Sequence, residues 1–200
     1  MYRTSNAHQL APQIVHCSWR NGTPVVVEIS VGPTARQQTE VTAQALSVIE
    51  PHTSLVPLLW SSSSVSASML TWLDVGNTTL HDMIQRRGGS GMPEWFTRHL
   101  FVQLLNAVKR MHDRDFVHRR ITCRNIAITS PLHDVIQLND FSSVTLRRAP
   151  RAKHMLSEHT LPYTGCDAYT APECDDPEQR TDIKVDLWMC GLVLYEIGRA

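Results

Sequence analysis

Apolar residues in the first third of the chain recur at strand spacing, then at helical spacing, then at strand spacing again. The first two strand-like runs are separated by Arg20-Asn21-Gly22-Thr23, a segment typical of the turn in a hairpin. The helical pattern ends at Pro51, since proline disrupts helices, and a serine-rich turn at 61–64 separates the last two runs. We therefore predict strands at 14–19 and 24–29, a helix at 34–49, and strands at 55–60 and 67–73.

The rest of the chain has mainly the spacing of helices. Pro93 stands where the first turn of a helix tolerates proline, and an apolar stripe of about five turns follows it. The stripe consists of Phe96, Leu100, Leu104, Val108 and Met111. We predict helices at 80–86, from 93 onward and at 182–197, short strands at 125–128 and 135–138, and a long exposed loop at 142–168. The last helix is apolar nearly all round, which is typical of burial inside a larger body.

The composition is that of a globular intracellular chain. Of its 200 residues, 42% are hydrophobic and 19% are charged, which is enough apolar content for a core. Its 19 basic and 19 acidic side chains cancel, so charge favours neither nucleic acid nor an anionic membrane as partner. Five scattered cysteines form no CxxC pair, which disfavours disulfides and structural zinc. Since we find no signal peptide and no apolar run long enough to span a bilayer, we expect a cytoplasmic location and no membrane segment.

Five motifs occur in a fixed order and resemble those of one family. Residues 118–125 (HRRITCRN) resemble the catalytic loop HRDLxxxN, and Asp140-Phe141-Ser142 resembles DFG. Ala171-Pro172-Glu173 is an intact APE motif, 186–191 matches DxWxxG, and 15–27 resembles the stretch from the end of a glycine-rich loop to a VAIK strand. In this order they resemble the eukaryotic protein kinase-like superfamily. The Arg-Asn ending of the loop is most similar to the tyrosine kinase and tyrosine kinase-like groups.

The resemblance implies an α+β, bilobal protein kinase fold. The small, β-rich lobe with one helix would cover residues 1–73, the hinge 74–78, and a mainly helical, partial large lobe 79–200. It also implies that the chain is truncated at its C-terminus, after the central buried helix of the large lobe.

The same resemblance shows which parts of the transfer chemistry have been replaced. In protein kinases a glycine-rich loop covers the ATP phosphates, a strand lysine holds them, Mg²⁺ neutralises them, and an aspartate accepts the proton of the substrate hydroxyl. The three glycine positions fall at His8, Leu10 and Gln13, the lysine at Glu28, and the aspartate at Arg120.

These assignments do not depend on a particular alignment. The only glycines before residue 76 are Gly22 and Gly32, and the first lysine is Lys109, far beyond the small lobe. Glu28 would repel a triphosphate, with about 4 kcal/mol between unit charges 4 Å apart at an effective dielectric of 20. The guanidinium of Arg120 has no lone pair to accept a proton, and loss of a general base typically costs about 10²- to 10⁴-fold in rate.

A degenerate nucleotide pocket and two metal ligands also follow from the resemblance. The pocket would be lined by Val15, Val26, Thr71, Trp72, Leu73 and Ala127. Asn125 and Asp140 match the family's Mg²⁺ ligands, and alone they could hold the ion only weakly. The alternative interpretation is that Asp140 pairs with Arg120 and is structural.

The residues that are kept serve packing, whereas the residues that are replaced serve transfer. We therefore expect a catalytically inactive pseudokinase that requires no cofactor and acts as a scaffold or allosteric regulator of a protein partner, for example an active kinase. One alternative is a kinase with residual Mg²⁺-ATP-dependent transfer through Asn125 and Asp140. A further alternative is a non-functional, truncated kinase fragment.

Overall fold

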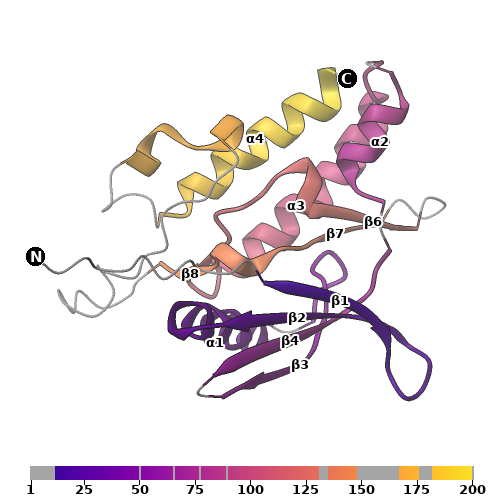
Figure 1. The fold of residues 1–200 in the computed structure, drawn as a ribbon. Helices are drawn as coiled ribbons and strands as arrows, with labels where there is room; N and C mark the ends of the chain where they lie inside the picture. The colour runs from indigo at the N-terminus through magenta and orange to yellow at the C-terminus, as the bar shows by residue number, and fades with distance from the viewer. Residues whose placement is uncertain are drawn as a thin grey trace, which may run out of the picture.

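A computed structural model describes residues 12–49, 51–64, 66–76, 78–88, 90–130, 135–147, 167–175 and 182–199. Two of the three predicted glycine-loop positions, His8 and Leu10, lie outside the described residues. The chain forms a sheet with one helix across it and a mainly helical part stacked against them (Figure 1). The fold is therefore α+β with two lobes, as the sequence predicts.

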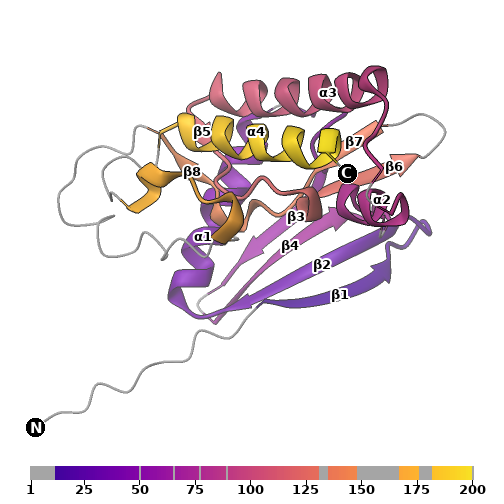
Figure 2. The ribbon, with the colours of Figure 1, turned by 90° about the horizontal axis from the view of Figure 1, so that it is seen from above.

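The first lobe is a four-stranded antiparallel sheet in the order β1-β2-β4-β3, with helix α1 against it (Figure 2). Its elements are β1 Gln13–Ser18, β2 Pro24–Val31, α1 Pro33–Val48, β3 Leu58–Ser63 and β4 Ala67–Leu73. Gly32 precedes α1 at a φ of 102°, a conformation that favours glycine, and Pro33 begins the helix. The sharp change of direction from β2 into α1 follows from this Gly-Pro pair.

The serine-rich stretch is a strand and not a turn, which corrects the sequence prediction. Ser61, Ser62 and Ser63 pair with Leu70, Met69 and Ser68, so β3 begins three residues later than expected and includes the serines. The hairpin closes instead at Ser64, whose N–H donates to the Ala67 carbonyl at 2.9 Å. Polar side chains are tolerated here because β3 is an edge strand with mostly exposed residues.

The second lobe consists of three described α-helices and two short two-stranded sheets. The helices are α2 Leu80–Arg86, α3 Glu94–His112 and α4 Lys184–Arg199; β5 Phe116–Val117 pairs with β8 Thr145–Leu146, and β6 Ile126–Ser130 pairs with β7 Val135–Leu138. A capping box begins α2: the Thr79 N–H donates to Asp82 at 2.9 Å, and the Asp82 N–H donates to the Thr79 hydroxyl at 3.2 Å.

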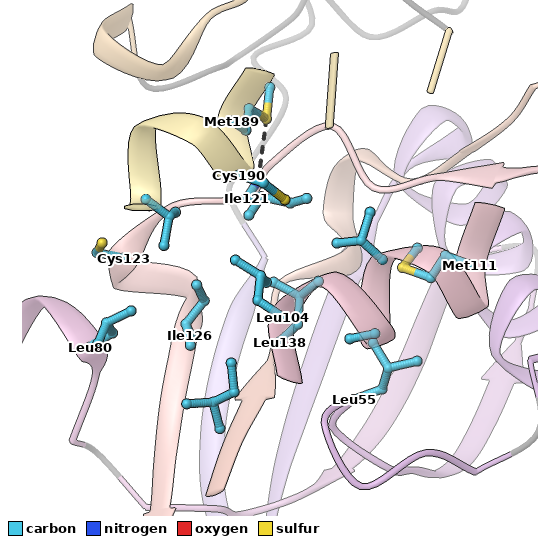
Figure 3. Close-up of a cluster of buried hydrophobic side chains, with 14 of the residues drawn as sticks. Leu55, Leu80, Leu104, Met111, Ile121, Cys123, Ile126, Leu138, Met189 and Cys190 are labelled. Carbon is cyan, nitrogen blue, oxygen red and sulfur yellow. Dashed lines mark hydrogen bonds between the residues drawn. The ribbon is translucent and has the colours of Figure 1, made fainter. Parts of the chain in front are cut away.

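The predicted stripe on α3 does face the core. Leu100, Leu104, Val108 and Met111 are each at most 1% exposed, whereas Phe96 is only partly buried. Figure 3 shows side chains from both lobes, including Leu55, gathered around Leu104 and Leu138 in one apolar cluster. At roughly 1.5–3 kcal/mol for each large buried apolar side chain, this shared cluster is a main source of stability.

Hydrogen bonds also join the two lobes. The Val56 N–H donates to the Leu138 carbonyl at 3.1 Å, and the Leu138 N–H donates to the Ser54 carbonyl at 2.9 Å. The Thr42 hydroxyl of α1 also donates to the Phe141 carbonyl at 3.1 Å. The segment from Leu138 to Phe141 is thus bonded to the first lobe at both of its ends.

Helix α4 has two different faces. Val185, Asp186, Met189, Cys190, Val193 and Ile197 are buried, and the Met189 sulfur accepts the Ile121 N–H at 3.4 Å (Figure 3). The opposite face exposes Leu187, Trp188, Leu194 and Tyr195. Neither this helix nor any other in the described part of the chain combines the length and apolarity needed to cross a membrane.

Candidate functional site

A cavity of about 440 Å³ lies where the first sheet meets the loops of the second lobe. This volume is within the range of small-molecule sites. Its wall consists of Pro12, Ile14, His16, Val26, Glu28, Val56, Trp72, Leu73, Asp74, Val75, Gly76, Arg120, Asn139, Asp140, Phe141 and Ser142. The predicted positions Glu28, Val26, Trp72, Leu73, Arg120 and Asp140 therefore come together at one place.

Strand register decides which residues of the sheet reach the cavity. His16 pairs with Val26, and Val26 pairs with Trp72, so these three form one row across β1, β2 and β4. Side chains alternate between the two faces of a strand. Val15 and Thr71, expected in the pocket, are opposite Val27 in the neighbouring row and do not line the cavity. Of the expected β4 positions, Trp72 and Leu73 line the cavity and Thr71 does not.

Two further expected positions do not line the cavity either. Ala127 is 2% exposed in β6, where its backbone bridges to Thr79. The Asn125 amide turns back onto its own loop and donates to the Arg120 carbonyl at 2.9 Å. Ala127 is therefore part of the packed second lobe, and Asn125 braces the loop that carries Arg120.

Arg120, Asp140 and Ser142 form a closed ring of polar contacts at the cavity wall. Arg120 Nε is 3.3 Å from Asp140 Oδ2, and Arg120 Nη1 donates to Ser142 Oγ at 3.0 Å. The Ser142 hydroxyl donates to Asp140 Oδ1 at 2.5 Å. The pairing of Asp140 with Arg120 is thus confirmed, and both carboxylate oxygens have partners within the chain.

The backbone at Asp140 fits this ring. Asp140 has a left-handed conformation, with φ 59° and ψ 71°, and its Oδ1 also accepts the Ser142 N–H at 3.3 Å. Aspartate is one of the few residues other than glycine that tolerate this conformation. The serine in the third position of the DFG-like motif is therefore a ring member, a role that the sequence alone did not indicate.

The loop that carries Arg120 is anchored by the buried carboxylate of Asp186 on α4. Asp186 is 0% exposed and accepts the N–H of His118 at 2.9 Å and the N–H of Arg119 at 2.7 Å. His112 Nε2 lies 2.8 Å from the same carboxylate. Arg119 has a φ of 64°, which is costly for a residue with a Cβ. Asp186 holds this turn in place, as its match to the DxWxxG motif implies.

Aromatic rings connect the loop to the sheet. His118 packs on Phe141 at 5.0 Å between ring centroids, and Phe141 stacks on Trp72 at 5.6 Å with an interplanar angle of 14°. His118 is fully buried, and burial lowers its pKa, although Asp186 and Asp140 act in the opposite direction. A neutral imidazole fits its neighbour, because the Arg120 N–H donates to His118 Nδ1 at 3.3 Å.

Glu28 faces the same cavity from β2. Its pKa is raised above the ordinary value of 4.5, first because burial disfavours the charged form and then because Asp140 repels it. A hydrogen bond from Trp72, whose only donor is the indole N–H, opposes this rise. A carboxylate therefore stands in the cavity at the position that the family fills with lysine.

The rim of the cavity contains an ion pair that the sequence did not reveal. His16 Nδ1 is 3.1 Å from Asp74 Oδ2, and the pKa of Asp74 is lowered, first by the Gly76 N–H and then by His16. The two residues are 58 positions apart in the sequence, and only the folded structure brings them together. The register of β1 against β2 places His16 opposite Val26, and both residues line the cavity.

The carboxylates and histidines of the site do not form a metal cluster. Across the described ranges, no group of three or more His, Cys, Asp or Glu side chains is arranged to hold an ion. Asp140 lines the cavity and Asn125 does not, so metal binding by this pair remains a prediction.

Comparison with known proteins places these observations in one family. A family model described as "Protein kinase domain" matches residues 31–199. CBL-interacting protein kinase 9 of Oryza sativa subsp. japonica is 31% identical over 148 residues, or 72% of this chain and 30% of the relative. CBL-interacting serine/threonine-protein kinase 21 of Arabidopsis thaliana is 32% identical over 112 residues, or 56% and 25%. Serine/threonine-protein kinase chk-1 of Caenorhabditis elegans is 34% identical over 106 residues, or 52% and 20%. The chain thus spans less than a third of each of these relatives.

We predict that Asp186→Asn destabilises the chain by about 1–3 kcal/mol, because one of two buried N–H groups loses its acceptor. Urea unfolding with an unchanged slope would measure this loss, and amide exchange at His118 and Arg119 should accelerate. Asp113→Asn is the control: the Asp113 side chain is exposed and forms a surface ion pair with Lys109 at 2.6 Å, so the midpoint should hardly move. Equal effects of the two substitutions would contradict the anchoring role.

We predict that Glu28→Gln stabilises the chain at neutral pH. A raised pKa means that the folded state binds the proton more tightly, so the wild-type chain loses stability as pH rises from 4.5 through the raised value. The advantage of the glutamine variant should therefore be largest at neutral pH and vanish below pH 4.5. Thermal unfolding of both proteins from pH 4 to 8 measures the difference. Glu94→Gln removes an exposed carboxylate from α3 and should not reproduce this profile.

Proposed function

The chain belongs to the protein kinase domain family, and we propose that it is a member that has lost phosphotransfer and acts in signalling by binding another protein. The observation that carries the proposal is the ring formed by Arg120, Asp140 and Ser142. A kinase needs a carboxylate at the first of these positions to orient and deprotonate the substrate hydroxyl. Here a permanent cation stands there and is bonded to the residue that would otherwise hold Mg²⁺.

The charged residues at the positions where a kinase holds the ATP phosphates support the same conclusion. Glu28 and Asp140 are both acidic and close enough to raise the pKa of Glu28. The single arginine of the cavity wall is engaged by Asp140 and Ser142. A triphosphate would therefore meet repulsion from Glu28 and compete with Asp140 for Arg120.

The packing features of the family are present beside these changes. Asp186 binds the loop backbone, Phe141 joins the aromatic stack, and Tyr169 is 8% exposed with its hydroxyl accepting the Cys123 N–H at 3.3 Å. A chain that keeps this packing framework but lacks the residues for phosphotransfer is suited to presenting a surface to a protein partner. Several similar proteins are named as CBL-interacting kinases, which supports protein binding as a general mode for such domains and does not identify a partner.

Two finer parts of the sequence interpretation remain predictions. The relatives named above are serine/threonine kinases or CBL-interacting kinases, so similarity to the tyrosine kinase groups rests on Arg124-Asn125 alone. The cytoplasmic location likewise rests on composition. In the alternative activity, Mg²⁺-ATP transfer through Asn125 and Asp140, Asp140 would have to leave both Arg120 and Ser142.

We predict a cooperative thermal transition whose midpoint does not rise with Mg²⁺ and ATP, because Arg120, the arginine among the described residues of the cavity wall, is already engaged by Asp140 and Ser142. Melting of the purified chain with ATP alone and with Mg²⁺-ATP tests this. An upward, Mg²⁺-dependent shift, together with transfer that Asp140→Ala abolishes, would overturn the proposal in favour of an enzyme. A broad, non-cooperative transition would favour the fragment alternative.

We also predict that Arg120→Asp does not restore phosphotransfer, because Glu28 still occupies the lysine position and a fourth carboxylate joins those of Glu28, Asp74 and Asp140 in the cavity. A radiolabelled transfer assay with a general protein substrate measures this, with Arg124→Asp as the charge-matched, exposed control. Turnover in Arg120→Asp above that of the control would show that the base position alone was limiting.

A further inference from the structure

Two pairs of ionisable side chains contact each other at the cavity wall, whereas the carboxylate of Glu28 contacts no basic side chain among the described residues. Arg120 is paired with Asp140 at 3.3 Å, and His16 is paired with Asp74 at 3.1 Å. Glu28 has no cationic partner anywhere in the described part of the chain. Glu28 on β2 is thus the carboxylate of the cavity wall for which the described residues provide no basic partner.

Glu28 also has unused hydrogen-bonding capacity. A carboxylate has about four acceptor positions on its two oxygens. Among the described residues, Trp72 donates one hydrogen bond to Glu28. The nearby carboxylate of Asp140 repels the negative charge of Glu28. A half-buried carboxylate in this situation gains more from a cationic hydrogen-bond donor than an exposed one does, because the surroundings screen the attraction less.

The wall beside Glu28 is flat, aromatic and apolar. Trp72 stacks on the buried ring of Phe141 with 14° between their planes and presents the aromatic surface to the cavity, and Val26, Val56 and Leu73 complete the apolar lining. A ring lying against this surface buries apolar area, and a cation near the face of a tryptophan or phenylalanine gains further attraction from the ring. The cavity therefore offers one anionic end next to an aromatic surface.

We propose that this cavity binds a small, flat organic cation, such as an aromatic amidine or amine. The charged group would contact the carboxylate of Glu28, and the ring would lie against Trp72, which Phe141 supports from within the protein. This ligand class is opposite in charge to a nucleotide triphosphate, and it follows from the exchange of charges at Glu28 and Arg120.

Isothermal titration with benzamidine and with benzamide tests the proposal, because the two probes share a ring and differ in charge. The wild-type chain should bind benzamidine about tenfold or more tightly than benzamide, as expected for a hydrogen bond to a charged group. Glu28→Gln keeps the shape of the side chain and should reduce this preference to less than about threefold. Glu94→Gln, on the exposed first turn of α3, should leave the preference unchanged.

A second variant examines the aromatic wall. Trp72→Leu should weaken both probes to a similar degree while leaving the preference for charge, provided that its melting curve remains cooperative. Equal affinity for benzamidine and benzamide, or no binding of either to the wild-type chain, would overturn the cation site. Phosphotransfer activity would instead overturn the proposed loss of catalysis and leave the comparison of the two probes untouched.

Discussion

The carboxylate of Asp186 fixes the geometry on which the candidate site depends. It is fully buried on α4 and accepts two consecutive backbone N–H groups, those of His118 and Arg119. Without these bonds the left-handed conformation of Arg119 would have little to stabilise it. The direction in which the chain leaves this turn decides where Arg120 points. A helix far along the sequence therefore determines that the arginine reaches Asp140 and not solvent.

The ring of Arg120, Asp140 and Ser142 gives each of these residues a structural role. An arginine in the position of a catalytic aspartate removes a base, but it would also leave a cation beside the cavity if nothing neutralised it. Asp140 neutralises it at 3.3 Å, and Ser142 contacts both residues. The arrangement is self-contained, because each member satisfies polar groups of the other two. Three changed or reused positions thus form one structural unit whose polar groups contact one another.

The bounds of helices and strands could be predicted from the sequence where the apolar pattern is local. The residues that line the cavity could not be predicted where they depend on strand register. Strand β4, helix α2 and strand β7 have the predicted bounds, because apolar spacing and flanking turns define them. The sequence predicts Thr71, Trp72 and Leu73 of β4 in the pocket; Trp72 and Leu73 line the cavity, whereas Thr71 pairs with Val27 and does not, a difference that depends on strand register. The pair of Arg120 with Asp140 could be predicted from two motifs. The bond of Ser142 to both, and the pair of His16 with Asp74, could not, because they arise from tertiary placement.

Glu28 and Arg120 together exchange the positions of two charges in the cavity: a carboxylate stands in the lysine position, and a guanidinium stands in the position of the catalytic aspartate. Arg120 by itself would supply a cation to a phosphate, but Asp140 engages it; Glu28 by itself could be matched by a nearby base, but none is in contact with it in the described residues. Burying such a carboxylate lowers stability at neutral pH, so the fold does not gain from it as packing. Positions that break a local rule at a cost to stability are typical of functional sites. The aromatic surface beside Glu28 makes a ligand of opposite charge the simplest reason for keeping it there.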